Sequence, residues 1–446
     1  MQPCSLRSPC RAAALLLPPL LLVGCLTAQL IPWHFGGLRE WSREWWRGAR
    51  RAPTWRGDWS DPPLPCKLPQ PVAVWSRGIM RSCCDTFPTR FQLDCCWGKR
   101  GPDNTPGEAW GERSDVDWTR VALRNMSIVY VAAYDMPRFL ARFITLPPSI
   151  RISLVTAQED VGVPRELFGS GRNLFGRSSP AGHSTALPLS LEAFIRDSRL
   201  LHWSVQNYDL AGCNTYSGCA PAAVSAKHLR KVSPIPLGID MHTADERNWV
   251  AGTKQSTCGQ QAQISSIATS APPLPSRRFA VLHAFACNDT WPERIRACQM
   301  LLAACDHKRH GRCMPFTHLH AQGRKSRPEV WRAVTQHAFV ACPPGRGIDT
   351  HRLWEVLLLG AIPIVLSSSL DRLLADFPVV AVQDWGDATN VTLLTAHYAR
   401  ITARFGPNLI ATPRARRQLT TAHWVDHIKR AHAAALGLLN RTHNNK

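Results

Sequence analysis

The chain has 446 residues, 45% of them hydrophobic, so it is long enough for two domains with cores of their own. Its 53 lysines and arginines outnumber 32 acidic residues, and the net charge of +21 favours acidic partners such as phosphorylated donors, acidic glycans or anionic membranes. The sequence holds no nucleic-acid-binding module and its basic residues are spread out, so we expect no nucleic-acid partner. The alternative, a secreted nucleic-acid-binding protein, rests on net charge alone and predicts binding that is lost at high salt concentration.

Residues 1–11 contain Arg7 and Arg11 and precede an apolar run at 12–31. A run of about 20 apolar residues behind positive charges predicts a cytosolic tail followed by a signal anchor. The alternative is a signal peptide cleaved after Ala28, which would give a secreted protein. We favour the anchor because Leu26 is larger than cleavage sites prefer, and so expect a single-pass type II protein of the Golgi or endoplasmic reticulum membrane.

Cysteines and glycosylation sequons agree with a lumenal location for the rest of the chain. Thirteen of the sixteen cysteines follow the apolar segment, an odd number that leaves at least one thiol free or intermolecular. The tight group at positions 83, 84, 95 and 96 predicts a local disulfide framework. Sequons occur at Asn125, Asn288, Asn390 and Asn440.

Residues 32–65 are rich in Trp, Arg and Pro without an apolar period, which predicts a stem. A first domain is expected over 66–240, with strands at 71–75, 127–133 and 150–157 and a helix at 191–197. An acidic loop at 158–164 follows the third of these strands, and ligands gather at the carboxyl ends of strands in open α/β sheets.

Residues 241–277 are Gln-, Ser-, Ala- and Pro-rich in part and predict an irregular linker. A second domain is expected over 278–400, opening with a strand at 278–284. A helix follows from Pro292, since proline favours the first helical position, and carries Arg294 in its first turn. Residues 401–446 predict closing helices.

The stretch from His337 to Trp385 is the most informative part of the chain. An apolar strand at 338–342 leads to a turn at 343–347, and a helix opens near Asp349 or Thr350, both good N-caps. Gly360 ends the helix, and strand AIPIVL, a short helix at 370–374 and a strand at 379–382 follow. Alternating strands and helices predict an α/β fold with parallel sheets covered on both faces.

The glycine-rich turn of this stretch has the features of a phosphate site. Glycines let backbone N–H groups approach a ligand, and a helix N-terminus carries partial positive charge. Arg346 and Arg352 add charged donors, and Glu355 could accept from ribose hydroxyls. The alternative is a tight strand-to-helix turn with Arg352 and Glu355 as a surface ion pair.

The motif P-x-G-x-G-x-D-T-H-R-x-W-E-x-L-x-x-G-x-I-P-I-V, followed by F-P-V-V, resembles the nucleotide-sugar half of exostosin-like glycosyltransferases. Upstream, W-x-x-Q-N-x-D (with Trp203, Gln206, Asn207 and Asp209) and K-V-x-x-I-P-L-G-I-D (231–240) match the same family more loosely. The resemblance implies two facing Rossmann-like domains, the GT-B architecture. It also implies a nucleotide-sugar donor, with UDP as the usual nucleotide, and a glycan or glycoprotein acceptor. The donor-binding residues it indicates, together with the capping positions, are Arg294, Gly345, Arg346, Gly347, Asp349, Thr350, Arg352 and Glu355.

The resemblance further implies inversion by direct displacement, with no metal and no cofactor. Such a reaction needs a general base near the acceptor, and Asp160 in the acidic loop is the candidate, with Glu159 and Asp209 as alternatives. Against this stands the ordinary role of a loop aspartate as a turn residue or cap. A rival hypothesis for the whole chain is a catalytically inactive GT-B-like protein that binds acidic glycans.

Two patterns that suggest a metal are set aside. The group Cys298, Cys305, His307, His310 and Cys313 fits no common zinc-finger spacing, and we favour a disulfide or buried thiols there. The triplet at 115–117, D-V-D, lacks the preceding apolar strand of a manganese-binding D-x-D motif.

Overall fold

The computed structural model describes residues 72–85, 118–119, 121–157, 162–168, 187–210, 213–214, 218–219, 226–241, 257–285, 287, 291–303, 314–319, 325–345, 347–410 and 412–444. The predicted tail, apolar segment and stem, 1–65, lie outside these ranges. Among the described helices we find none with the length and apolar character needed to cross a bilayer.

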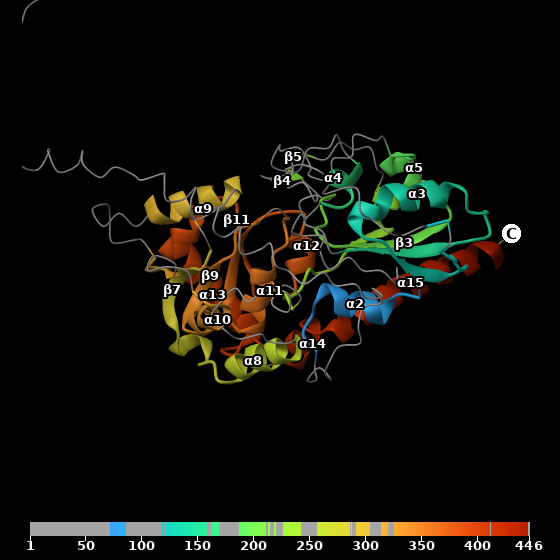
Figure 1. The fold of residues 1–446 in the computed structure, drawn as a ribbon. Coiled ribbons are helices and arrows are strands. Elements are labelled where there is room, and N and C mark those ends of the chain that lie inside the picture. The colour runs from blue at the N-terminus through green and yellow to red at the C-terminus, as the bar shows by residue number, and fades with distance from the viewer. Residues whose placement is uncertain are drawn as a thin grey trace, which may run out of the picture. The chain divides into compact units, whose positions relative to one another are not determined.

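The first sheet has four parallel strands in the order β1-β2-β3-β6. Every residue of β1, β2 and β3 is buried, as expected of parallel strands covered on both faces. Helices α3 and α5 cover one face, and α2 and α15 the other (Figure 1). The bounds are α2 Ser76–Cys83, β1 Ser127–Tyr130, α3 Met136–Ile144, β2 Ile152–Thr156, α4 Arg165–Phe168, α5 Leu191–Arg196, β3 Leu200–Val205, α6 Ala226–Leu229 and β6 Val232–Pro234.

The second sheet has five parallel strands in the order β11-β10-β9-β7-β8. One face packs on α10 and α11, and the other on α9 and α13. The bounds are β7 Arg278–His283, α9 Pro292–Ala303, β8 Phe316–His318, α10 Arg327–Thr335, β9 His337–Ala341, α11 His351–Leu358, β10 Ile362–Leu366, α12 Asp371–Leu374, β11 Val380–Val382 and α13 Val391–Phe405. The chain is therefore an α/β protein with two parallel sheets, as the alternation of strands and helices predicts.

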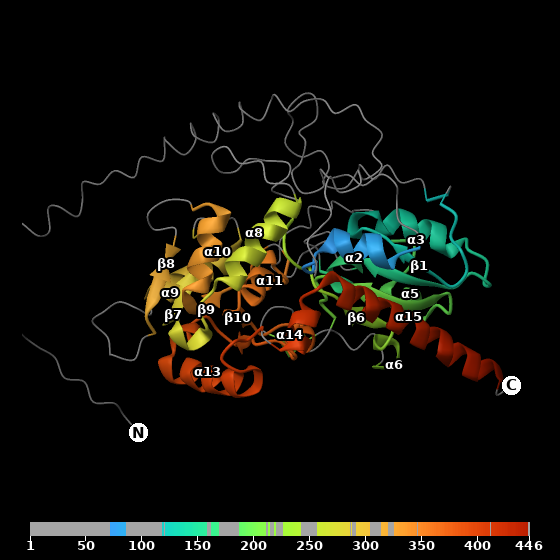
Figure 2. The same ribbon diagram turned by 90° about the horizontal axis from the view of Figure 1, so that it is seen from below.

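The described residues also include the 3-10 turns η2 Ala133–Asp135, η3 Leu274–Ser276 and η5 Asp387–Thr389, and the antiparallel pair β4 Cys213–Asn214 and β5 Gly218–Cys219. Helix α14 spans Pro413–Gln418 and α15 spans Thr421–Asn444. Helix α15 lies beside α2 (Figure 2) and contacts β3. Its His432 Nδ1 is 2.7 Å from Ser153 Oγ of β2.

Two sequence-based expectations are wrong. The strand at 71–75 is not in a sheet: Ala73 and Trp75 form only isolated bridges, to Thr420 and Gly238, because α2 begins at once at Ser76. The irregular linker contains α8, Thr257–Thr269. No apolar period marks this helix because it buries glutamines: Gln260 and Gln261 are buried, and Gln261 Oε1 accepts from the Ala73 N–H at 3.2 Å.

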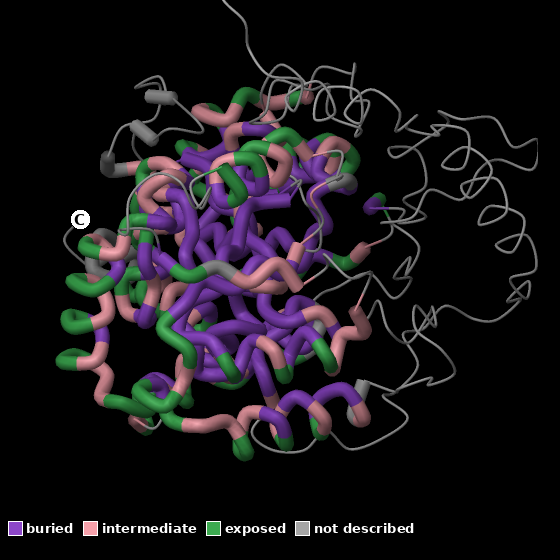
Figure 3. Tube along the Cα trace, turned by 90° about the vertical axis from the view of Figure 1, so that its left-hand side faces the viewer, coloured by how far each residue is buried: buried purple, intermediate pink, exposed green. Residues whose placement is uncertain are grey.

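The core follows the strands of both sheets, as the buried segments of Figure 3 show. Both sheets belong to one compact unit. Loops at the carboxyl ends of their strands contact one another: Ser369 Oγ, after β10, donates to the Tyr208 carbonyl, after β3, at 2.5 Å. The ends of the strands where ligands gather in α/β proteins thus meet in this chain.

Candidate functional site

The turn between β9 and α11 has the local structure that its residues predict. Strand β9 ends at Ala341, the chain passes through Gly345 and Gly347, and α11 begins at His351. Thr350 is the N-cap, its hydroxyl accepting from the Leu353 N–H at 3.4 Å, so of the two predicted caps the structure selects Thr350. Arg346 lies outside the described residues.

Arg294 from the first turn of α9 lies against Gly345. A Cβ added to Gly345 would be 2.7 Å from Arg294 Nη2, so only glycine leaves room for the guanidinium in this position. The two residues are neighbours although 51 positions separate them in the sequence. A cationic group therefore borders the turn that could bring backbone amides to an anion.

Asn207 from the first sheet borders the turn at Gly347. It is fully buried with φ of 49°, an uncommon conformation for a residue with a side chain. Its Oδ1 accepts from the Asp349 N–H at 2.9 Å and lies 2.6 Å from the Cβ that Gly347 lacks. The sequence match singles out Asn207 without assigning it a role; this contact gives it one, the positioning of the turn.

Asp349 points away from the helix end that it was expected to cap. Its carboxylate accepts from the Leu237 N–H and from Trp354 Nε1–H, both at 2.8 Å. The side chain is buried, and burial raises the pKa of the carboxyl to about 6 against the lowering effect of those two donors. Asp349 thus fastens the turn to the loop after β6.

Glu355 lies on the buried side of α11, between two arginines. Its carboxylate receives Arg327 Nη2 at 2.7 Å and lies 3.2 Å from Arg352 Nη1. Burial raises the pKa of Glu355, but Arg327 and then Arg352 outweigh that effect and hold it below its usual value. The Arg352–Glu355 ion pair is present, yet Glu355 is 3% exposed and so is not the surface residue of the alternative interpretation.

Arg327 is a central residue of this region that sequence reasoning missed. Its guanidinium donates to Glu355, to Gln260 Oε1 at 2.9 Å and to the Asp240 carbonyl, and it stacks over the Trp331 ring. Only the capping box at Ser326, which starts α10, is visible in the sequence. The hydrogen-bond partners of Arg327 come from distant segments, so no local sequence pattern predicts them.

Of the three candidate bases, the structure describes only Asp209. Asp160 and Glu159 lie outside the described residues. Asp209 is buried, and its carboxylate accepts the backbone N–H groups of Arg165 at 2.7 Å and Glu166 at 2.8 Å. Burial raises its pKa to about 6 despite these bonds. Asp209 is thus tied to the start of α4.

A hollow lies beside the turn, with about 310 Å³ of empty space when its open mouth is included. Because that figure includes open solvent, the enclosed part of the hollow is much smaller than a ligand pocket. Its lining is mostly apolar and comes from the ends of β9 and β10 and from α11 and α12, including Cys342, Pro344, Ile348, Leu353, Ser368 and Leu370.

Cys298 forms a disulfide with Cys287, a partner outside the group of cysteines and histidines considered in the sequence analysis. The other members of that group, at 305–313, and the D-V-D triplet lie outside the described residues. Cys83 and Cys84 are free thiols with sulfurs 2.6 Å apart; Cys95 and Cys96 of the predicted framework are not described. His283 and His318 lie next to Cys287 and are the described residues that could hold a metal with it.

No family model matches this chain. No curated protein matches it either. Two solved structures, both histidine variants of the wall teichoic acid polymerase TagF, are 9% and 10% identical and cover 72% of this chain and 92% and 91% of their own. The TM-score is 0.20 in both cases, and at that level the likeness carries no inference about this protein.

Proposed function

We propose that the chain is a glycosyltransferase that moves a sugar from a nucleoside-diphosphate donor, with UDP as the expected nucleotide, to a hydroxyl of a glycan or glycoprotein. The transfer is inverting and uses neither metal nor cofactor. One observation carries the proposal. The glycine turn between β9 and α11 contacts Arg294 at Gly345, and at Gly347 it contacts Asn207, which follows β3 of the first sheet.

The leaving group explains why glycines and arginines are needed together. A diphosphate departs with negative charge, and stabilising that charge is the main task of a metal-free site. The helix dipole at the N-terminus of α11 would stabilise the diphosphate by only ~0.3–1 kcal/mol, whereas a hydrogen bond to a charged group is worth about 1.5–3 kcal/mol. In this proposal Arg294 and Arg352 therefore supply most of the stabilisation, with Arg346 as a third contact.

The remaining donor contacts are assigned by their position along the turn and α11. Gly345 and Gly347 offer backbone amides, Thr350 contributes as the N-cap of α11, and Asp349 acts indirectly by fixing the turn. The ribose contact proposed for Glu355 has to share the carboxylate with Arg327 and Arg352.

The acceptor hydroxyl needs a base on the side of the first sheet. Asp160 is our first choice because it comes soon after β2 in the sequence, four residues beyond the last strand residue, Thr156. Asp209 is less suited, since both of its oxygens already accept backbone N–H groups. Asp160→Asn is expected to abolish transfer and to leave donor binding unchanged; unaltered turnover would remove Asp160 from this role.

A panel of nucleoside-diphosphate sugars in a thermal-shift assay tests the proposal and identifies the donor. A ligand that binds the native state raises its stability by mass action, so we expect one UDP sugar to raise the melting temperature most. Release of UDP, accelerated by an acceptor glycan, then separates an enzyme from an inactive glycan-binding protein, which would respond to the glycan alone. No shift with any member of the panel would refute the proposal.

We also propose that the chain acts in the lumen of the Golgi or endoplasmic reticulum, held by the segment 12–31. The sequon residues Asn125 and Asn390 are exposed, as glycan attachment requires. The test is the electrophoretic mobility of the full chain from secretory cells after endoglycosidase treatment. A shift that becomes smaller in Asn125→Gln and in Asn390→Gln supports the location, and an unglycosylated chain argues against it.

A further inference from the structure

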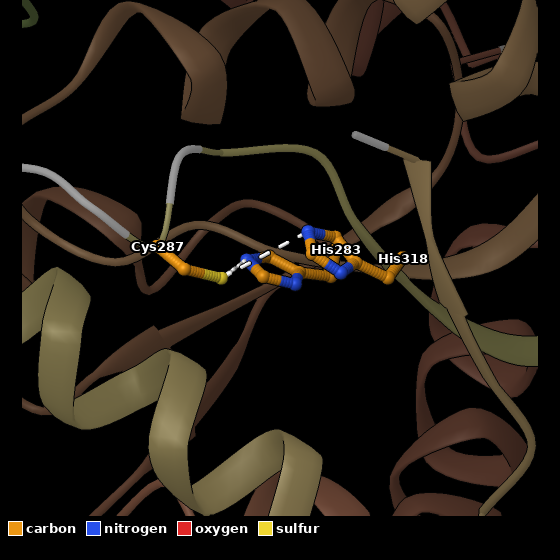
Figure 4. A group of neighbouring side chains, drawn as sticks. All are labelled: His283, Cys287 and His318. Carbon is orange, nitrogen blue, oxygen red and sulfur yellow. Dashed lines mark hydrogen bonds between the residues drawn. The ribbon is translucent and has the colours of Figure 1, made fainter. Parts of the chain in front are cut away.

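Two histidines lie side by side at the carboxyl edge of the second sheet. His283 is the last residue of β7 and His318 the last of β8, and the parallel register pairs them directly. Their rings stack with centroids 4.4 Å apart and an interplanar angle of 18° (Figure 4). His283 is fully buried, so the pair has an inner member within the protein and an outer member, His318, closer to the surface.

Two sulfurs join the histidines at this point. Cys287 Sγ lies 3.6 Å from His283 Nε2 and 3.8 Å from His318 Nε2 (Figure 4). Cys287 is bonded to Cys298, which is buried on α9. Two cysteines and two histidines are thus gathered from β7, the connection after it, α9 and β8.

The two distances from Cys287 Sγ match two edges of the tetrahedron around a zinc ion. With Zn–N bonds of about 2.05 Å and Zn–S bonds of about 2.3 Å, a tetrahedron requires N···S separations of ~3.6 Å. Both measured nitrogen–sulfur separations are within a few tenths of an ångström of that value. Cys298 Sγ is the ligand atom that has to move: it is bonded to Cys287 Sγ and lies outside the group of His283, Cys287 and His318, whose ligand atoms are all within 4.8 Å of one another. After reduction it would have to settle ~3.8 Å from Cys287 Sγ, the S···S edge of the same tetrahedron.

We propose that His283, Cys287, Cys298 and His318 form a structural site for a zinc-like divalent cation that is available when the Cys287–Cys298 disulfide is reduced. A dithiol reductant breaks the S–S bond by donating two electrons and two protons and becomes a disulfide itself. The cation then displaces the two thiol protons and binds two thiolates and two imidazoles. In the oxidised chain the two sulfurs are bonded to each other. They cannot bind the cation, because a cysteine binds a metal as its thiolate.

The site is structural rather than catalytic, because four protein ligands close the coordination shell of zinc. It therefore goes beyond the proposed transfer reaction and does not depend on it. The spacing H-x3-C-x10-C-x19-H corresponds to no common finger, and only the strand register brings the histidines together. For this reason the sequence alone does not announce it.

Cobalt titration of the full chain tests the proposal. The chain is reduced with a phosphine, which is then removed without air, and Co²⁺ is added with absorption recorded. We expect a thiolate-to-cobalt charge-transfer band and the intense visible bands of a tetrahedral ion, with one Co²⁺ per chain displaced by Zn²⁺. The oxidised chain is expected to give neither band. A reduced chain without these bands overturns the proposal.

Substitutions decide whether these four residues are the ligands. His318→Ala, at the less buried histidine, is expected to weaken cobalt binding at least ~100-fold, and His318→Cys to restore a tetrahedral spectrum with a stronger thiolate band. Cys305→Ser and Cys313→Ser are the matched controls and should leave the spectrum unchanged. Tetrahedral bands that survive in His318→Ala, or that vanish in the controls, would place the ion elsewhere and overturn the assignment.

Discussion

Asp349 is a carboxyl group placed where water cannot reach it, yet it has two good donors. Leu237 N–H and Trp354 Nε1–H satisfy its oxygens, but burial dominates and raises its pKa to about 6. In the unfolded chain the same group titrates near 4. Between about pH 4 and pH 6 the folded state therefore holds a proton that the unfolded state has lost, and the stability contributed by this group falls as pH rises through that window.

Asp349→Asn removes this titration and changes the pH dependence of stability. The wild type gains about 1 kcal/mol over the variant between pH 7 and pH 5, because the wild type alone takes up the proton on folding. Urea unfolding of both proteins at the two pH values measures the difference. Asp209, with the same raised pKa, is present in both and cancels. An equal gap at the two pH values would contradict the assignment.

The two glycines of the turn are expected to respond differently to the same substitution. In Gly345→Ala the new Cβ meets the flexible end of Arg294, so stability should change by less than ~1 kcal/mol while donor affinity falls. In Gly347→Ala the Cβ meets Asn207, which is held by the Asp349 N–H, so stability should fall by ~1–3 kcal/mol. Urea unfolding and donor titration of both variants provide the check. Equal destabilisation would show that Arg294 is as firmly held as Asn207.

At the scale of the elements, α8, α10 and α11 are joined through one buried guanidinium. Arg327 on α10 reaches Glu355 on α11 and Gln260 on α8. Such a pair adds little net stability compared with an apolar pair, but breaking it leaves an unpaired charge inside the protein. This asymmetry makes α11, and with it the glycine turn, sensitive to Glu355.

Glu355→Gln is expected to destabilise the fold by about 3 kcal/mol, since Arg327 keeps its charge and loses its counter-ion. The matched control is Arg296→Ala, which breaks an ion pair with Asp384 whose side chains are 52% and 39% exposed. Exposed pairs contribute less than ~1 kcal/mol, so the control should unfold at nearly the wild-type urea concentration. Similar losses in the two variants would contradict the buried role of Glu355.

The elements that the sequence predicts are those whose cause is local. The run at 338–342 is apolar, Thr350 can cap the next helix, and Gly360 has a φ of 71° that suits glycine, so strand, cap and helix end follow from neighbouring residues. Helix α8 was missed because its buried face combines Ile264 and Ile267 with two glutamines, Gln260 and Gln261, whose partners lie in other segments. Apolar periodicity in the sequence reveals a helix only when the buried face of that helix is made of hydrophobic side chains.

At the scale of the molecule, the candidate site depends on pairs that are distant in sequence. Asn207 and Asp349 are 142 residues apart, and the register that pairs His283 with His318 belongs to a sheet rather than to a motif. The sequence resemblance indicated the turn and its arginines, but not that a residue after β3 would contact Gly347. The acidic loop with Asp160 lies outside the described residues, so the proposed base remains a prediction from the sequence.

Calorimetric titration of UDP into Arg294→Ala, compared with Arg296→Ala, is the most direct measurement of the central claim that the glycine turn and its arginine bind a diphosphate. Both arginines are on α9, but Arg294 faces Gly345, whereas Arg296 pairs with Asp384. Losing one charge-assisted contact of about 1.5–3 kcal/mol should weaken UDP binding by Arg294→Ala roughly 10- to 150-fold, with Arg296→Ala at the wild-type value. Equal affinities in the two variants, or no UDP binding by the wild type, would contradict the account.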